Sequence, residues 1–245
     1  MFRFFIDSDQ ISEGVLTVTG SDVNHIRNVL RMKAGEDIEA VDETGRVATC
    51  RIRETAADEI LADVLFTEES GAELTNRITL YMGLPKFDKM ELIVQKAVEL
   101  GVYRIVPVRM KRCVLKLDEK KAEGKVRRWQ SIAEAAAKQA KRGLIPEVAS
   151  VMTFGKALSE AEGLNHILLP YECAEDITKT RELIGRIGPD ESVAVFIGPE
   201  GGFDSSEVEA AREAGAQIIT LGRRILRTET AAISAMSILM YELEK

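Results

Sequence analysis

Two glycine-bearing turns near the end of the chain hold residue types that suit ligand binding. The first is Gly-Pro-Glu-Gly-Gly at 198–202, which follows the apolar run SVAVFI and precedes the helix-capping pattern Asp-Ser-Ser-Glu. Glycines let a ligand approach the backbone, and the first turn of a helix carries N–H groups without partners. A tight strand-to-helix turn is the simpler alternative, but four Gly or Pro residues in five exceed what such a turn needs. We therefore predict a ligand-binding loop.

The second turn is Leu-Gly-Arg-Arg-Ile-Leu-Arg-Thr-Glu-Thr at 221–230, between an apolar run and a series of small apolar residues. It places three arginines in a chain whose net charge is -7. A solvated basic loop, or a helix start capped by Thr228 or Thr230, would be simpler alternatives. Capping explains the threonines, but it does not explain Arg227 and Glu229 beside them. We predict that this turn is a second ligand-binding loop.

After residue 76, short apolar runs alternate with helical segments. This pattern predicts the strands and helices that position both turns. The expected strands are ITLYMGL (78–84), YRIVPV (103–108), NHILLP (165–170), SVAVFI (192–197) and QIITL (217–221). The expected helices are 88–101 with an Asp88-x-x-Glu91 start resembling a capping box, 118 to about 143, 153–163, 180–187, 207–215 and 230–244. This alternation predicts a mainly parallel α/β sheet. Loops after its strands, including the weaker candidate Tyr171-Glu172, would then share one cleft at the carboxyl edge.

The first segment has a different texture, with short alternating runs separated by Gly, Asp and Asn. The expected strands are 2–6, 14–20, 37–42, 46–54 and 59–66. One helix is expected at 21–35, with Ser21 or Asp22 as its N-cap and Gly35 just past its end. The polar stretch 67–77 is the expected linker. We predict a small barrel-like domain over 1–70 and an α/β domain over 76–245.

Charge is distributed unevenly along the chain. Residues 1–75 hold 7 Lys and Arg against 16 Asp and Glu, residues 76–145 hold 17 against 7, and residues 146–245 hold 9 against 17. Solvated helix faces produce charge runs too, but a middle third of net charge +10 favours a surface that binds polyanions. Two further groups of basic residues are either solvated or in contact with phosphates. One is His25, Arg27 and Arg31, whose spacing suits one helix face, and the other is Lys86, which follows a strand.

Composition narrows the classes of protein. The chain is 45% hydrophobic and 30% charged, its longest apolar runs are too short for a bilayer, and its N-terminus turns acidic too early for a secretory signal. Three distant cysteines and two histidines argue against a metal site or a disulfide framework. We expect a cytoplasmic protein without a membrane span or a metal. Trp129, in a basic helix, is interpreted as a core residue.

The motifs together resemble the RsmE family of ribosomal RNA methyltransferases, members of the SPOUT superfamily. The resemblance covers nearly the whole chain, and its segments come in family order. These segments are HIRNVLRMKAGEDIEAVD, GLPKFDKMELIVQKAVELGVYRIVPV, KRCVLKLDEKKAEGKVRRWQSIAEAAAKQAKR, IGPEGGF and LGRRILRTETA. The chain departs from the family where Lys-Gln-Ala-Lys-Arg at 138–142 replaces Glu-Gln-Ser-Gly-Arg and where Arg223 replaces proline. Both changes keep or add positive charge.

The resemblance implies a fold and a function. The implied fold is α/β, with a SPOUT-type knotted parallel-sheet methyltransferase domain whose C-terminal segment forms a trefoil knot, and a small N-terminal PUA-like β-barrel domain that binds RNA. The implied activity is S-adenosylmethionine-dependent methylation of uridine N3 in 16S ribosomal RNA, a step of rRNA processing and ribosome biogenesis. The implied partners are 16S rRNA or the small ribosomal subunit, and a second copy of the chain in a homodimer.

The resemblance also suggests roles for individual residues. The expected cofactor-binding residues are Leu169, Gly198, Glu200, Gly201, Gly202, Leu221, Gly222, Ile225, Leu226 and Thr230. The expected RNA-binding residues are Arg27, Arg31, Lys33, Lys86, Arg112 and Arg142. For catalysis, Arg227 would stabilise negative charge on the base, and Glu200 or Glu229 would accept the N3 proton. The sequence does not rank the two carboxylates.

Two rival interpretations stay open from the sequence. An RNA chaperone or assembly protein could keep this fold without catalysing a reaction. A nucleotide hydrolase could use 198–202 for phosphate, although no Walker lysine and no cluster of metal ligands accompanies that loop. Titration with S-adenosylmethionine and with ATP would separate the two enzymes.

We predict that reversing charge at Arg27 and Arg31 weakens RNA binding and leaves cofactor binding unchanged. RNA binding through phosphate contacts should also fall steeply as the salt concentration rises. Filter binding at several salt concentrations and calorimetry with S-adenosylmethionine measure the two affinities. Loss of both affinities together would indicate misfolding, and a flat salt response would refute the basic face.

Overall fold

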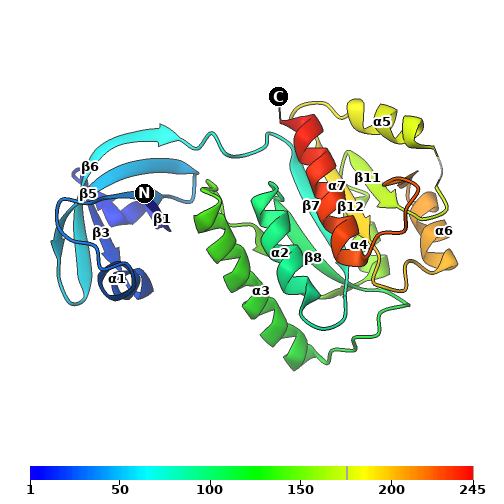
Figure 1. Cartoon of the computed structure of the whole chain (residues 1–245), viewed down its shortest axis with the longest axis horizontal. Coiled ribbons are helices and arrows are strands. Elements are labelled where there is room, and N and C mark those ends of the chain that lie inside the picture. The colour runs from blue at the N-terminus through cyan, green and yellow to red at the C-terminus, as the bar shows by residue number, and fades with distance from the viewer. Residues whose placement is uncertain (175, 245) are drawn as a thin grey trace. The chain divides into compact units, whose positions relative to one another are not determined.

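The computed structural model describes residues 1–174 and 176–244, which divide into two compact units (Figure 1). Unit 1 comprises residues 1–73 and 137–145, and unit 2 comprises 74–136 and 146–245. The elements are β1 (Phe2–Phe5), a 3-10 turn (Ser8–Gln10), β2 (Ile11–Ser12), β3 (Val15–Thr19), α1 (Ser21–Asn24), a π-helical turn (His25–Val29), β4 (Asp37–Val41), β5 (Arg46–Thr55), β6 (Glu59–Glu69), β7 (Arg77–Gly83), α2 (Lys89–Glu99), β8 (Arg104–Arg109), α3 (Glu119–Gln139), β9 (Glu147–Val148), β10 (Met152–Thr153), α4 (Phe154–Ala161), β11 (His166–Pro170), α5 (Ile177–Gly185), β12 (Ser192–Ile197), α6 (Ser205–Glu213), β13 (Gln217–Ile219) and α7 (Thr228–Leu243).

Unit 1 is built on one six-stranded sheet with the order β1-β4-β5-β6-β3-β2. Its strands are antiparallel except for the parallel pair β1 and β4. Alternate apolar side chains, such as Leu16 and Val18 of β3, point into a core that includes Phe4 and Ile26. The strands expected in this segment are confirmed. β6 runs on to Glu69, so the expected linker is shorter than predicted. Closure of the sheet into a barrel stays a prediction.

The helix expected at 21–35 is wrong in its length and its cap. α1 starts after Gly20 and passes into the π-helical turn, in which the N–H of Leu30 bonds the carbonyl of His25. A π turn is wider than an α turn, so the three-to-four residue spacing no longer defines one face. Arg31 lies beyond the turn in the left-handed region, at φ 56°. Arg27 and Arg31 therefore do not share a helix face.

The segment 137–145 adds a second stretch of chain to unit 1, which the expected division at 70 and 76 does not include. The guanidinium of Arg3 donates to the carbonyls of Lys141 and Arg142, and the ammonium of Lys138 pairs with Asp22. The Arg142 side chain is only 3% exposed and makes two hydrogen bonds to the carboxylate of Glu73. The end of α3 is thereby tied into unit 1.

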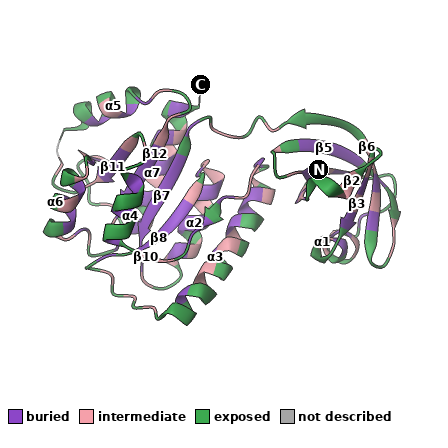
Figure 2. Ribbon diagram, turned by 180° about the vertical axis from the view of Figure 1, so that it is seen from behind, coloured by how far each residue is buried: buried purple, intermediate pink, exposed green. Residues whose placement is uncertain are grey.

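Unit 2 is built on a parallel sheet with the order β10-β8-β7-β12-β11-β13, and β9 pairs with β8. The inner strands are buried (Figure 2). Ile78 and Leu80 of β7 face one side, while Tyr81 faces the other and stacks on Phe196 of β12 at 4.5 Å between ring centroids. Helices α4 and α6 cover the side of Tyr81 and Phe196, and α2, α5 and α7 cover the opposite side (Figures 1 and 2). The predicted mainly parallel α/β sheet is confirmed.

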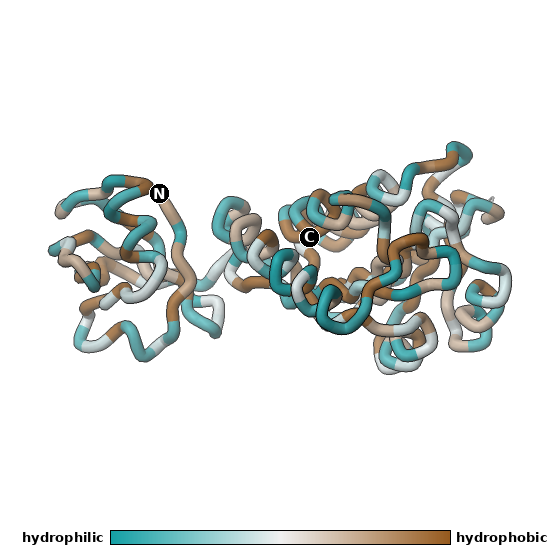
Figure 3. Tube along the Cα trace, turned by 90° about the horizontal axis from the view of Figure 1, so that it is seen from below, coloured by the Kyte–Doolittle hydropathy of each residue, from teal (hydrophilic) through white to brown (hydrophobic). Residues whose placement is uncertain are grey.

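The final helix is apolar over most of its length (Figure 3) and packs against α2 and β12. Ala232, Ala235 and Met236 are among its buried residues, and the small side chains allow close packing. In the described part of the chain, every helix is too short or too polar to cross a bilayer. The apolar character of α7 is therefore explained by burial within unit 2.

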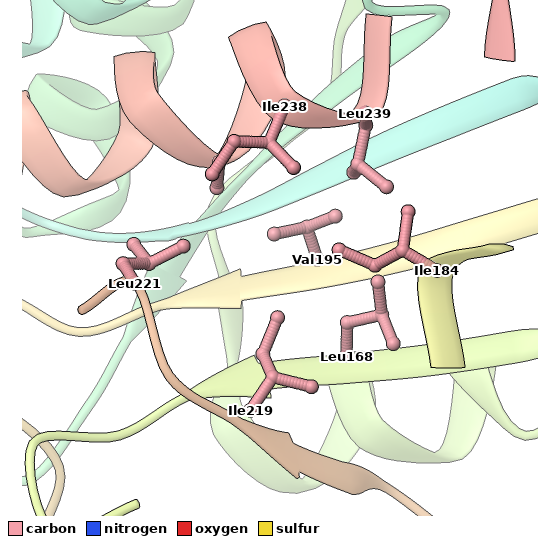
Figure 4. Close-up of a pocket in the computed structure, with 8 residues that line it drawn as sticks. Leu168, Ile184, Val195, Ile219, Leu221, Ile238 and Leu239 are labelled. Carbon is pink, nitrogen blue, oxygen red and sulfur yellow. The ribbon is translucent and has the colours of Figure 1, made fainter. Parts of the chain in front are cut away.

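A small void lies where α5 and α7 meet three strands of the sheet (Figure 4). Its volume is about 10 Å³. It is lined by Leu168, Ile184, Val195, Ile219, Leu221, Ala235, Ile238 and Leu239. All of these side chains are apolar, so a water molecule there would find no side chain to bond. Leu221 thus anchors the start of the arginine-bearing turn in a dry core.

We predict that Arg142→Met destabilises the protein by about 3 kcal/mol, because it leaves the partly buried Glu73 carboxylate without its guanidinium partner. Arg186→Met is the matched control, since its ion pair with Glu182 is largely exposed and should contribute less than about 1 kcal/mol. Urea unfolding followed by circular dichroism measures both changes. Equal effects would contradict a structural role for the Arg142–Glu73 pair.

Candidate active site

Three loops meet at the carboxyl edge of the parallel sheet in unit 2 and enclose one pocket of about 880 Å³. They follow β11, β12 and β13, and Lys89 at the start of α2 completes the lining. The lining residues are Lys89, Pro170, Tyr171, Glu172, Ala174, Ile177, Ile197, Gly198, Pro199, Glu200, Gly202, Phe203, Thr220, Leu221, Gly222, Arg223, Arg224, Ile225, Leu226, Arg227, Thr228 and Ala231. The strand order reverses between β7 and β12, and such switch points are where open α/β sheets bind ligands. The prediction that the two glycine-bearing turns share one cleft is confirmed.

The turn after β12 needs its glycines for close packing and for its backbone angles. A Cβ on Gly198 would lie 3.1 Å from the carbonyl carbon of Gly202, and Gly202 itself has φ 67°. A Cβ on Gly83, at the end of β7, would lie 2.7 Å from the ring of Pro199. Glycines in β7 and in the turn therefore let the two chain segments touch. α6 then begins with the predicted Asp204–Glu207 capping box.

The turn after β13 is shaped by two buried threonines. The hydroxyl of Thr220 accepts the N–H of Gly222 at 3.2 Å, which stabilises a turn in which Gly222 has φ 110°. Thr228 is the first residue of α7, and its buried hydroxyl donates to the carbonyl of Gly198 at 2.6 Å. The predicted cap at Thr228 or Thr230 is wrong. The N-cap residue of α7 is Arg227, and its side chain makes no capping hydrogen bond. Thr228 instead joins the two turns.

Lys89 bridges the two carboxylates that flank the pocket. Its ammonium lies 3.2 Å from Glu200 of the first turn and 3.1 Å from Glu229 of α7. The backbone N–H of Lys86 also donates to Glu200, at 3.0 Å. The predicted Asp88–Glu91 capping box is wrong, since Asp88 makes no side-chain cap and Glu91 pairs with an arginine of α3.

Both carboxylates are ionised at neutral pH. Partial burial alone would raise the pKa of Glu200, but N–H donors of its own backbone and of Lys86, together with the Lys89 ammonium, lower that pKa below its ordinary 4.5. Burial, its own N–H group and Lys89 act in the same way on the pKa of Glu229, with a further contribution from Arg227. The pKa of Lys89 is raised by hydrogen bonding to Glu229 first, against a smaller opposing effect of burial. The cluster thus carries two negative charges and one positive charge.

Most of the expected cofactor residues line the pocket. Those that do are Gly198, Glu200, Gly202, Leu221, Gly222, Ile225 and Leu226. Leu169 is fully buried in the core beneath Pro170. Gly201 faces Arg112, because a Cβ added to Gly201 would lie 3.0 Å from the Cβ of Arg112. Thr230 is exposed and does not line the pocket. Ile225 is 85% exposed, so its side chain projects away from the protein core.

Arginines gather at the rim of the pocket. Arg223, Arg224 and Arg227 line it and are exposed. Arg112 is also exposed and donates to the carbonyl of Gly201 at 3.1 Å. A pocket with a cationic rim suits a ligand next to a polyanion.

The expected RNA contacts differ in accessibility. Arg31, Lys33 and Arg112 are exposed, whereas Arg27 and Lys86 are half-buried, and Arg27 donates to the carbonyl of Ala57. Arg142 is wrong as a phosphate contact, because its guanidinium is buried and bonded to Glu73. The sign of a charge in the sequence does not reveal whether a partner already neutralises it.

Sequence reasoning missed Lys89, Thr220 and Thr228 as site residues. Lys89 starts the helix that follows β7, beside the switch point of the sheet. That position could have identified Lys89 as a site residue, because ligands bind at such points. The threonines carried no pattern of their own. Among residues 1–174 and 176–244, no three His, Cys, Asp or Glu side chains are grouped closely enough to hold a metal ion.

Comparison with protein families assigns both parts of the chain. Residues 72–240 match the model of the RNA methyltransferase domain. Residues 18–65 match the model of the RNA methyltransferase PUA domain.

Individual relatives match over nearly their whole length. The chain is 35% identical over 250 residues to the ribosomal RNA small subunit methyltransferase E of Bacillus subtilis, covering 100% of this chain and 98% of the relative. It is 33% identical over 233 residues to the enzyme of the same name from Mesomycoplasma hyopneumoniae, covering 95% and 96%. A crystal structure of that enzyme from Neisseria gonorrhoeae, bound to S-adenosylmethionine, has a TM-score of 0.83 at 31% identity, covering 98% and 97%.

We predict that Gly198→Ala weakens S-adenosylmethionine binding about tenfold, equivalent to roughly 1.4 kcal/mol of strain in the turn. The added methyl group would press on backbone atoms of Gly202 and Phe203 at 3.1–3.3 Å, and these cannot rotate away. Gly155→Ala in α4 is the control, because no heavy atom lies within 4 Å of the new Cβ. Calorimetry compares the variants, and unchanged affinity in Gly198→Ala would contradict a role for this turn in the pocket.

Proposed function

The chain belongs to the ribosomal RNA small subunit methyltransferase E family, which makes it an S-adenosylmethionine-dependent rRNA methyltransferase, and we propose that it methylates N3 of a uridine in 16S rRNA. The observation that carries this proposal is the convergence of both glycine-bearing turns on one pocket rimmed by arginines. A pure RNA-binding protein would not need a pocket of about 880 Å³, which is ample for a nucleoside-sized ligand.

The residues of the pocket fit S-adenosylmethionine. Leu221 and Leu226 offer apolar surface for the adenine, and Gly198 and Gly202 leave the backbone open to close approach. When bound, S-adenosylmethionine supplies an already activated methyl group. The chain therefore has to orient the uridine, exclude water and manage the N3 proton.

The two glutamates suit an orienting role better than that of a proton acceptor. Their pKa values lie below 4.5 and both bond to Lys89, so each is a weak base at neutral pH. Exposed Arg227 at the pocket rim can instead stabilise negative charge on O2 or O4 as the N3 proton leaves to solvent. We propose Arg227 as the principal catalytic side chain, with Glu200 and Glu229 as its supporting carboxylates.

RNA is proposed to bind through both domains. The PUA-like domain, residues 1–70, presents exposed Arg31 and Lys33, and the methyltransferase domain, residues 76–245, presents Arg112 beside the pocket. Such contacts to phosphates position the RNA without selecting its sequence. The target uridine must be unpaired or leave its stack to reach the pocket.

We extend the proposal to a trefoil knot in unit 2 and a closed barrel in unit 1. The knot is supported by the path of the chain, which runs from β13 at the far edge of the sheet back across the pocket to α7 beside α2. Folded chains rarely knot, so the hydrogen bond between Thr228 and Gly198 has a second use in holding the crossing segments together. The barrel is supported by the register shifts in the pairing of β5 with β6, because such irregularities bend a sheet.

A homodimer is also part of the proposal. Leu92 of α2 and Ile238 and Tyr241 of α7 are exposed apolar side chains on helices that pack side by side. An apolar surface of this kind is typical of an interface with a second copy. Sedimentation at equilibrium measures the mass in solution, and a monomer would refute the dimer. Ribosomal RNA as substrate implies that the enzyme works in the cytoplasm.

We predict that the purified protein converts one uridine of 16S rRNA to 3-methyluridine, and that Arg227→Met lowers kcat about 100-fold with little change in S-adenosylmethionine affinity. Because Glu200 and Glu229 stay ionised, the single-turnover rate should rise between about pH 6 and 8.5 as the N3 proton becomes easier to remove. Nucleoside mass spectrometry identifies the product, and a radioactive methyl group gives the rate.

Arg212→Met is the control, since Arg212 is exposed on α6 and absent from the pocket lining. S-adenosylmethionine binding without methylation of naked rRNA or small subunits would favour the RNA-binding protein. Methylation at another uridine atom would refute N3 as the methylated atom, but the protein would still be an rRNA methyltransferase. Binding of ATP in place of S-adenosylmethionine would favour the hydrolase.

A further inference from the structure

We propose that Lys89 is a positioning residue for methyl transfer, because its ammonium joins the turn after β12 to the first turn of α7 beside the pocket. The proposal rests on the proposed function and deepens it. Glu200 belongs to the turn after β12, Glu229 to the first turn of α7, and Lys89 to the start of α2. Three elements far apart in the sequence thus meet at one nitrogen atom, and Lys89 itself lines the pocket.

The electrostatics make this contact more than a surface ion pair. The Lys89 side chain is 27% exposed, Glu200 24% and Glu229 17%, so solvent screens the three charges only in part. Without the ammonium, two carboxylates would face each other across the same space. Like charges at that range repel and one of them tends to take up a proton.

Lys89 is the main cation beside Glu200 and Glu229. The backbone N–H of Lys86 and the N–H groups of the glutamates themselves donate to the carboxylates, and Arg227 adds a weaker attraction to Glu229. Among the described residues, Lys89 is the ion-pair partner of both Glu200 and Glu229.

Loop geometry is what the bridge would secure. The Thr228–Gly198 hydrogen bond joins the two turns at the base of the pocket, and the Lys89 bridge joins them again through side chains. Two crosslinks define the relative position of the turns better than one, which lowers the cost of ordering the site when substrates bind. Lys89 therefore acts through Glu200 and Glu229, and the methyl group need not touch it.

The test compares Lys89→Met, Lys89→Arg, Glu229→Gln and the double variant Lys89→Met/Glu229→Gln in the full-length chain. Lys96→Met is the matched control, because Lys96 lies on the same helix and pairs with Glu99 outside the pocket. We expect Lys89→Met to weaken S-adenosylmethionine binding about tenfold, within the usual range of coupling energies between contacting residues. Lys89→Arg should restore most of the affinity. The double variant should bind better than Lys89→Met, because one unpaired carboxylate has been removed.

A pH series separates positioning from a merely structural role. In the wild-type protein the affinity for S-adenosylmethionine should be constant from about pH 5.5 to 8, since both carboxylates remain ionised there. In Lys89→Met the repulsion raises the pKa of one carboxylate, so the affinity should show an inflection between about pH 5 and 7. Loss of packing alone would not create an inflection.

Several results would overturn the proposal. Lys89→Met with wild-type affinity and rate is one, and independent effects of Lys89→Met and Glu229→Gln are another. If Lys89→Met fails to fold by circular dichroism, Lys89→Arg decides, and full loss of S-adenosylmethionine affinity in a folded Lys89→Arg variant would count against the proposal. A wild-type protein without methyltransferase activity would refute the proposed function, whereas the calorimetric pH series would still test the bridge.

Discussion

The hydrogen bond from the Thr228 hydroxyl to the Gly198 carbonyl is the contact on which the site depends. It is partly buried, and it joins the turn after β12 to the start of the last helix. Parallel strands place both turns at one edge of the sheet, but strand ends alone leave their separation undetermined. This bond determines that separation, and the glycines on either side let the backbones come close enough to form it.

Charge then divides the pocket into two regions. Beside it, two carboxylates are neutralised in part by Lys89, and its rim carries Arg223, Arg224 and Arg227. A cationic methyl donor is attracted by negative charge and an anionic RNA chain by positive charge, and the two regions provide these charges separately. The same arrangement explains how an acidic protein can act on a polyanion, since the positive charge is concentrated where the substrate arrives.

Local patterns predicted local structure well. The turns at 198–202 and 221–230 were identifiable because glycines, an arginine cluster and flanking strands lie together in the sequence. The Lys89 bridge was not, since it depends on three elements that only the fold brings together. The helix expected at 21–35 failed because packing imposed a π turn at His25–Val29, and Arg142 failed because its partner Glu73 lies 69 residues earlier. The knot and the dimer came from resemblance alone.

The two-part make-up of unit 1 has a consequence for the order in which the protein forms on the ribosome. Arg3 of the first strand finds its carbonyl partners in Lys141 and Arg142, so these contacts wait for more than half of the chain to be made. Closing so long a loop is slow, and until it closes the apolar sheet of unit 1 lacks its final segment. Because the core of unit 1 comes from residues 4–64, the nascent N-terminal segment can bury its apolar side chains first and bind residues 137–145 later.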